Sequence, residues 1–167
     1  TPRLSASTVL PSSETRRRPP QNSQVPHRSL VSAAIAKASL DPPPWCSEAA
    51  KARVAPTREG YVNAIQVWPF TDGALYQVYA AVGRVTVIAL QPGEELVTVA
   101  AGDTVRWIVG DTSSGSGDAL RVNVMVKPIR SGLKTNLVIT TSRRTYLLEL
   151  SSTEKTWMAS VSWEYPK

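Results

Sequence analysis

The sequence predicts an all-β fold, an antiparallel β-sandwich of about eight to nine strands that follows an extended, proline-rich arm with one short helix. Two observations support this division. Nine of the 13 prolines lie before residue 59, whereas only one of the 11 Trp, Tyr and Phe residues does. After residue 59, short β-rich runs recur about every eight to twelve residues, and no segment has the apolar spacing of a helix.

The charge distribution gives the same boundary. The predicted arm, residues 1–58, holds nine Lys and Arg residues against three Asp and Glu, and therefore carries the whole formal charge of +6. The predicted sandwich domain, residues 59–167, holds ten of each and is neutral. The arm has too few large apolar side chains to offset the entropy of ordering its backbone, whereas the domain is long enough to bury a core.

One part of the arm has the pattern of a helix. Ser29 is a candidate N-cap, an apolar stripe follows it, and Asp41–Pro44 ends the helix, which predicts a helix over residues 29–40. A helix of this length is marginal alone in water, so its stripe should dock on its own domain or on a neighbouring subunit. Trp45, after the proline run, is a candidate anchor with the same two alternatives. The candidate partner-contact residues are therefore Leu30, Val31, Ala34, Ile35 and Trp45.

Composition argues against several classes of site. Cys46 is the only cysteine and His27 the only histidine, so an internal disulfide, a Cys- or His-based metal cluster and a Ser-His-Asp triad are excluded, and no cofactor is expected. No apolar run approaches the ~20 residues of a membrane span. The basic triplet Arg16–Arg18 lacks interleaved aromatic residues, so direct nucleic-acid binding is not expected from this chain.

Nine strands are predicted in the domain, separated by turn residues. In chain order they cover residues 64–68, 75–80, 84–90, 96–100, 105–109, 120–127, 136–140, 145–150 and 158–163. Asp72–Gly73 predicts a hairpin between the first two strands, and Pro92–Gly93 predicts a turn after the third. Gly110–Asp118 is rich in Gly and Ser and predicts a flexible connection, because it lacks the residues of a phosphate loop or a calcium loop.

Few residues of the domain point to chemistry. Glu94, Glu95 and Asp103 could act as acid and base if the fold brought them together, but carboxylates beside turn glycines more often cap backbone N–H groups. Arg143 and Arg144 are expected at a solvated corner. The tryptophans of the domain are expected in the core or on a sheet face rather than on a sugar-binding platform. These tryptophans are Trp68, Trp107, Trp157 and Trp163.

Five segments of the domain, taken in order, are similar to the N-terminal domain of the TrbG family of conjugative type IV secretion proteins, which is related to the CagX-type outer-membrane core components. These segments are Val85–Glu94, Ala101–Trp107, Val126–Pro128, Thr135–Tyr146 and Val161–Pro166. The resemblance extends over roughly Tyr61 to Pro166. It departs from the family at Ser142, where an aspartate is usual, and we expect residues 1–167 not to include the family's second, C-terminal domain.

The resemblance implies a non-enzymatic structural subunit in the Gram-negative periplasm. Copies of the chain would form a ring in the inner layer of the secretion core complex, associated with the outer membrane, and its partners would be the channel-forming subunit and the lipoprotein. The alternative is a stand-alone β-sandwich module that binds carbohydrate or an extended peptide. A hydrolase that uses Glu94, Glu95 or Asp103 is a third hypothesis.

Overall fold

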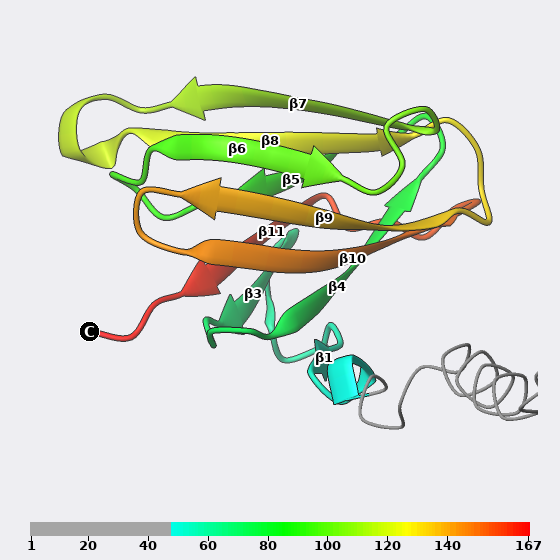
Figure 1. Cartoon of the computed structure of the whole chain (residues 1–167), viewed down its shortest axis with the longest axis horizontal. Helices are drawn as coiled ribbons and strands as arrows, with labels where there is room; N and C mark the ends of the chain where they lie inside the picture. The colour runs from blue at the N-terminus through cyan, green and yellow to red at the C-terminus, as the bar shows by residue number, and fades with distance from the viewer. Residues whose placement is uncertain (1–47) are drawn as a thin grey trace, which may run out of the picture. The chain divides into compact units, whose positions relative to one another are not determined.

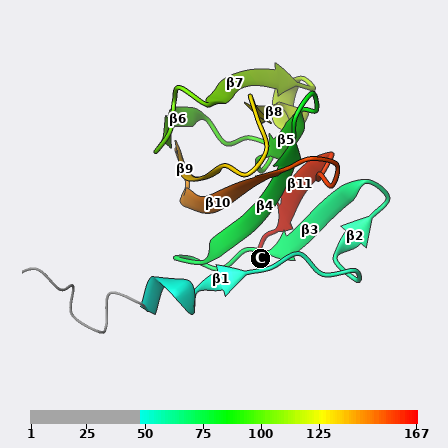
Figure 2. The same cartoon turned by 90° about the vertical axis from the view of Figure 1, so that its right-hand side faces the viewer.

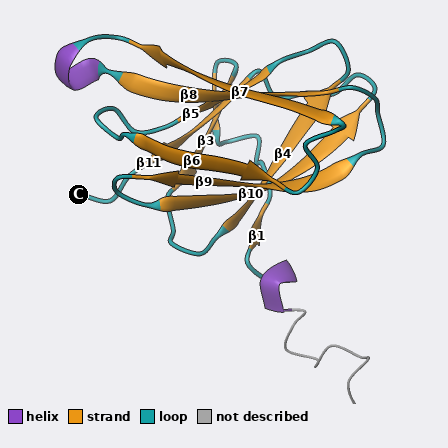
Figure 3. Ribbon diagram, turned by 45° about the horizontal axis from the view of Figure 1, so that its top comes forward, coloured by secondary structure: helices purple, strands orange, loops and turns teal. Residues whose placement is uncertain are grey.

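The structure, a computed structural model, describes residues 48–167. These residues form two β-sheets, along whose strands buried and exposed side chains alternate (Figures 1 and 3). The order in the five-stranded sheet is β1 (Arg53–Val54), β4 (Leu75–Ala81), β10 (Thr145–Thr153), β9 (Lys134–Thr141) and β6 (Leu96–Ala101). The order in the six-stranded sheet is β2 (Tyr61–Val62), β3 (Ile65–Pro69), β11 (Ser160–Glu164), β5 (Thr86–Ala89), β8 (Arg121–Pro128) and β7 (Trp107–Ser114). The all-β prediction is confirmed.

The core lies between the two sheets and follows from the period of two in the strands. Val122, Val124 and Val126 of β8 point inward, and the residues between them are partly exposed. β10 alternates in the same way, with Tyr146 and Leu148 buried. Four of the buried aromatic rings lie in one chain of contacts with centroid distances of 4.6 to 6.1 Å. They belong to Trp68, Tyr76, Trp163 and Tyr146.

The strand pairing is mixed, whereas the sequence predicted antiparallel pairing throughout. β4 runs parallel to β1 and β10, and β11 runs parallel to β3 and β5. The other ladders are antiparallel. β4 and β11 pair with strands that are not their neighbours in sequence, since β4 lies between β1 and β10 and β11 lies between β3 and β5. At least 20 residues separate the members of each parallel pair, more than the dozen or so that a parallel connection needs.

The predicted hairpin at Asp72–Gly73 is wrong, although the turn itself is present. Gly73 has a φ of +75°, and the Ala74 N–H donates to the Thr71 carbonyl at 3.2 Å. The strands on either side, β3 and β4, belong to different sheets. The buried Tyr76 hydroxyl accepts from the Thr71 N–H at 2.9 Å and donates to the Pro69 carbonyl at 3.2 Å, which holds this corner between the sheets.

Two further differences concern strand boundaries. Residues 110–114, predicted as loop, continue β7 and pair with β8 as far as Ser114 and Arg121, because ladder hydrogen bonds do not depend on side-chain type. Only the short connection that holds a 3-10 turn, Gly117–Ala119, is left between β7 and β8. β1 and β2, of two residues each, were not predicted. β1 is held by a two-pronged ion pair from Arg53 to Glu149, with N···O distances of 2.8 and 2.9 Å.

The predicted helix over residues 29–40 lies outside the described residues, and so do all five candidate partner-contact residues: Leu30, Val31, Ala34, Ile35 and Trp45. No helix within residues 48–167 is long and apolar enough to cross a membrane.

Candidate functional site

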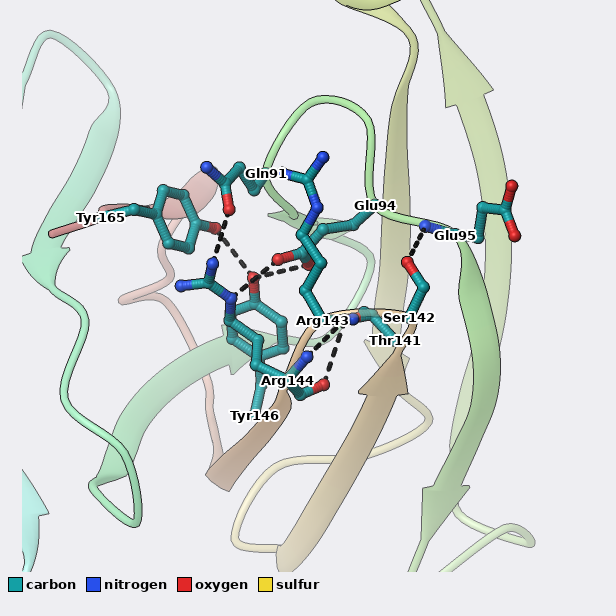
Figure 4. A network of polar contacts seen from close by, with 9 residues as sticks. All are labelled: Gln91, Glu94, Glu95, Thr141, Ser142, Arg143, Arg144, Tyr146 and Tyr165. Atoms are coloured by element: carbon teal, nitrogen blue, oxygen red, sulfur yellow. Dashed lines mark hydrogen bonds and ion pairs between the residues drawn. The ribbon is translucent and has the colours of Figure 1, made fainter. Parts of the chain in front are cut away.

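A polar cluster is buried at one end of the sandwich, where four turns or strand ends meet (Figure 4). Arg144 lies in the turn between β9 and β10, and Glu94 lies in the turn between β5 and β6. Tyr165 follows β11, and Phe70 follows β3. The cluster therefore joins segments that leave both sheets. Its members are Phe70, Gln91, Glu94, Arg144, Tyr146 and Tyr165.

Arg144 is the centre of this cluster. Its Nε lies 2.8 Å from Glu94 Oε1, in an ion pair whose two atoms do not form an aligned hydrogen bond. Its Nη2 donates to Gln91 Oε1 at 2.7 Å. The guanidinium carbon also lies 4.4 Å from the ring centroid of Tyr165 and 4.8 Å from that of Phe70, within the range of cation–π contacts. The guanidinium is thus held by one carboxylate, one amide and two rings.

The two tyrosine hydroxyls extend the cluster into the core. Tyr146 donates to Glu94 Oε2 at 2.8 Å, and its oxygen lies 3.0 Å from the Tyr165 oxygen. Because the Tyr146 proton points to the carboxylate, Tyr165 donates to Tyr146. Burial raises the pKa of Tyr146 far above its ordinary value and that of Tyr165 to about 12. Both phenols are therefore neutral near pH 7.

The cluster corrects two expectations about single residues. Glu94 was expected to cap a turn, but its buried carboxylate pairs with Arg144 and Tyr146. Arg144 was expected at a solvated corner, but only 20% of its side chain is exposed; Arg143 beside it is exposed as predicted. The turn at Pro92–Gly93 is confirmed, with a φ of +77° at Gly93, and it positions Glu94.

The three carboxylates proposed for acid/base chemistry have separate surroundings. Asp103 caps the following turn as expected, since its Oδ1 accepts from the N–H groups of Val105 at 3.2 Å and Arg106 at 3.0 Å. These hydrogen bonds, that of Arg106 foremost, lower the pKa of Asp103. The Glu95 side chain is exposed and points away from Glu94 (Figure 4). Nothing in this arrangement pairs a free base with a nucleophile.

Ser142 joins the β9–β10 turn to the start of β6. Its Oγ accepts from the Glu95 N–H at 3.0 Å, and its own N–H donates to the Glu95 carbonyl at 2.9 Å. Thr141 Oγ1 accepts from the N–H groups of Arg143 and Arg144 in the same turn. An aspartate, the residue that the family resemblance leads one to expect at position 142, would supply the same kind of acceptor, and here a serine hydroxyl supplies it.

Three of the four tryptophans of the domain lie in the core, as predicted. Trp68, Trp107 and Trp163 are buried, and Trp157 is half-buried, with the guanidinium carbon of Arg84 5.1 Å from its ring centroid. These four residues therefore present no exposed aromatic row for a sugar. Within residues 48–167 there is also no group of three His, Cys, Asp or Glu side chains that could hold a metal ion.

Exposed apolar side chains lie at the edges of both sheets. β6 and β7 are edge strands of different sheets, lie near one another (Figure 2), and border a groove lined by residues of both. Val97, Val105 and Ile108 on or beside these strands are 66%, 83% and 55% exposed. At the other edge of the six-stranded sheet, Tyr61 and Val62 of β2 are 41% and 60% exposed.

The fold and these contacts define a β-sandwich domain with an internal ion pair at one end and with some of its exposed apolar residues on or beside the edge strands β2, β6 and β7. The CagX family model, described as "Conjugal transfer protein", matches residues 63–167, and the chain belongs to this family. It is also similar to the "Probable conjugal transfer protein TrbG" of Sinorhizobium fredii (strain NBRC 101917 / NGR234), with 44% identity over 84 residues. The match covers 50% of this chain and 31% of that relative's length.

Membership in this family supports a role in conjugation through type IV secretion. The matched residues include the whole polar cluster, from Phe70 to Tyr165, and the edge strands β6 and β7.

Proposed function

We propose that this chain is a non-enzymatic, structural ring subunit of the core complex of a type IV secretion system that transfers DNA in conjugation. Copies of the chain form the inner layer of the core in the Gram-negative periplasm, associated with the outer membrane. The channel-forming subunit and the lipoprotein of the core complex are its partners. Family membership and the similarity to a protein named for conjugal transfer support this proposal.

The observation that carries the proposal is the composition of the edge strands β6 and β7 and the exposure of their apolar side chains. β6 contains no charged residue and β7 contains one, Asp111, so neither has the lysines or prolines that commonly keep free edges apart. Both edges carry exposed valine or isoleucine side chains. In a protein that stays alone in solution, such a surface favours aggregation, whereas in an assembly it is covered by the next subunit.

The positions of the apolar edges fit a ring. The six-stranded sheet has β2 at one end and β7 at the other, and the two edges differ in sequence and length. Contact between the β6–β7 side of one copy and the β2 side of the next is heterologous, and repeating such a contact gives a ring when the rotation between copies closes. The Arg144 cluster connects the two sheets at one end and so stiffens each copy.

The basic arm contributes to assembly in this proposal. Its charge and its apolar stripe at Leu30, Val31, Ala34 and Ile35 are suited to a strap across a neighbouring subunit, with charge complementarity setting its orientation. The domain is neutral overall, so its composition gives no reason to expect direct contact with DNA.

Cysteine cross-linking tests the heterologous contact. In a chain with Cys46→Ser, we expect Val97→Cys and Val62→Cys together to give a ladder of cross-linked multimers in the assembled complex. Each single variant should stay uncross-linked, because position 97 faces position 62 of another copy and not its own equivalent. Dimers from the single Val97→Cys variant would show a two-fold contact instead and would contradict the proposed ring interface.

The open β6 and β7 edges are also compatible with one alternative function. In it, the chain is a stand-alone module that binds an extended peptide as a further strand. The same experiment separates the two functions. A stand-alone module gives no ladder with any pair of cysteines, at any protein concentration.

A further inference from the structure

An apolar groove lies on the outer face of the five-stranded sheet, beside the first residues that the structure describes. Its volume is about 280 Å³. The 3-10 turn at residues 48–50 and the start of β1 form one side, with Ala49 and Ala52, and the sheet forms the floor, with Leu75, Val138 and Leu147. Among the described residues that line it, Asn136 is the only one with a polar side chain.

The size of the groove restricts what can occupy it. Pockets for small-molecule ligands usually measure about 300 to 1,000 Å³, so this groove is at or below the lower limit and suits a single large side chain. The residues within 48–167 that line it carry no charge, which favours an apolar occupant. An aromatic side chain buries about 150 to 250 Å² in such a place, and the indole N–H also needs an acceptor, which Asn136 can supply.

The chain itself provides such a side chain at the required position. Trp45 precedes Glu48, the first described residue, by three positions, and Ala49 already lines the groove. Three residues of extended chain span at most about 10 Å. Trp45 is also the only aromatic residue among the first 58, so no other aromatic side chain of the arm competes for the groove.

We propose that Trp45 of the same chain fills the groove between Ala49, Leu75, Val138 and Leu147. The indole then fixes the point at which the arm leaves the domain. From the sequence, Trp45 and the apolar stripe at Leu30–Ile35 belong to one set of candidate partner-contact residues. In this proposal their roles differ: Trp45 anchors the arm to its own domain, and the stripe contacts a neighbouring subunit. The inference on Trp45 holds whether or not the chain forms a ring.

The fluorescence of the full-length chain tests this, because the other four tryptophans are buried or half-buried. The difference between the emission of the native chain and that of Trp45→Phe gives the emission of Trp45. We expect a blue-shifted difference spectrum that iodide quenches weakly. A red-shifted, freely quenched difference spectrum would overturn the proposal.

Two groove variants make the test specific. Leu147→Lys places a charge on the floor, and Ala52→Arg fills the groove from its exposed rim without altering the sheet. We expect either to raise the iodide quenching of Trp45 severalfold, whereas Leu120→Lys, at an exposed position between β7 and β8, should leave it unchanged. Unchanged quenching in both groove variants would contradict the site. Protection that disappears on dilution to the monomer would assign the groove to Trp45 of a second copy and overturn the same-chain contact.

Discussion

Arg144 and Glu94 lie 2.8 Å apart, between Nε and Oε1, although they belong to turns far apart in the sequence. The Glu94 turn follows a strand of the six-stranded sheet and leads into a strand of the five-stranded sheet, and Arg144 belongs to a hairpin of the five-stranded sheet. Tyr165, which stacks on the same guanidinium, extends from the six-stranded sheet. The pair therefore connects the two layers at one end of the sandwich.

Removal of the Arg144 charge should destabilise the domain strongly. Arg144→Met leaves the buried Glu94 carboxylate without its partner, and the loss of one member of a buried pair costs about 3 to 5 kcal/mol. Since 20% of the Arg144 side chain is exposed, we expect a loss near about 3 kcal/mol in the free energy of unfolding. Urea unfolding at pH 7 measures it.

The matched control is Arg143→Met, one residue away and exposed, which should change stability by less than about 0.5 kcal/mol. The double variant Arg144→Met with Glu94→Gln should be more stable than Arg144→Met alone, because the amide carries no unpaired charge and still accepts from Tyr146. Equal effects of Arg143→Met and Arg144→Met would contradict the role of the ion pair.

The tyrosines of the cluster predict a loss of stability in alkali. The pKa of Tyr165 is raised to about 12 and that of Tyr146 is raised further, whereas both are about 10 in the unfolded chain. The unfolded state therefore loses these protons first. Their contribution is fully present below pH about 10 and is lost as the pH rises toward and through the folded values.

Urea unfolding curves recorded at about four pH values between pH 8 and pH 11 measure this loss. Tyr165→Phe removes one of the two groups, so its stability should fall less steeply with pH than that of the native chain. Parallel curves for the two proteins would show that Tyr165 does not titrate as its burial requires.

Charge on the edge strands should weaken assembly without unfolding the domain. Val97→Lys on β6 and Ile108→Lys on β7 place a lysine at positions that are 66% and 55% exposed, where it meets solvent in the free chain and an apolar neighbour in the ring. Val82→Lys, at a position that is 45% exposed in the β4–β5 turn, is the matched control. We expect the two edge variants, but not the control, to reduce the fraction of ring measured by sedimentation, while all three keep the thermal stability of the native chain. Full assembly of both edge variants would exclude these edges from the interface.

Deletion of the arm should also weaken assembly. The deletion must end before the residues that contact the domain. Residues up to 58 cannot all be removed without damage, since Arg53 and Val54 pair with β4 and the Ala55 carbonyl accepts from the Trp68 indole at 3.3 Å. Removal of residues 1–41 leaves these contacts and Trp45 in place. We expect an intact melting curve and fewer assembled rings by electron microscopy, and an unchanged number of rings would contradict a role of the arm in assembly.

The strands were predictable because their core-facing positions alternate locally. In β8 and β10 every second residue is buried, and this pattern is visible in the sequence without any knowledge of the partner strand. The partners were not predictable in the same way. Asp72–Gly73 specifies a turn, but whether the chain then pairs back or crosses to the second sheet depends on β10, which lies about 70 positions later and pairs with β4.

The polar cluster was not predictable for the same reason. A carboxylate beside a turn glycine and an arginine in a basic turn each have an ordinary local role, and Asp103 does fulfil it. Glu94 and Arg144 differ only because the fold places them together, with the Arg144 guanidinium against the rings of Phe70 and Tyr165. The one sequence signal was the family resemblance, because Glu94 and Arg144 lie in two of the matching segments. It did not indicate that the two residues are in contact.

The mass of the complex purified from conjugating cells under native conditions tests the ring assignment most directly. With the full-length chain tagged at its natural level, native mass spectrometry should give a multiple of the chain's mass, with further envelope proteins of the secretion apparatus present in fixed proportion. A monomer that purifies alone, at every concentration and without partner chains, would contradict the assignment of this chain as an assembly subunit.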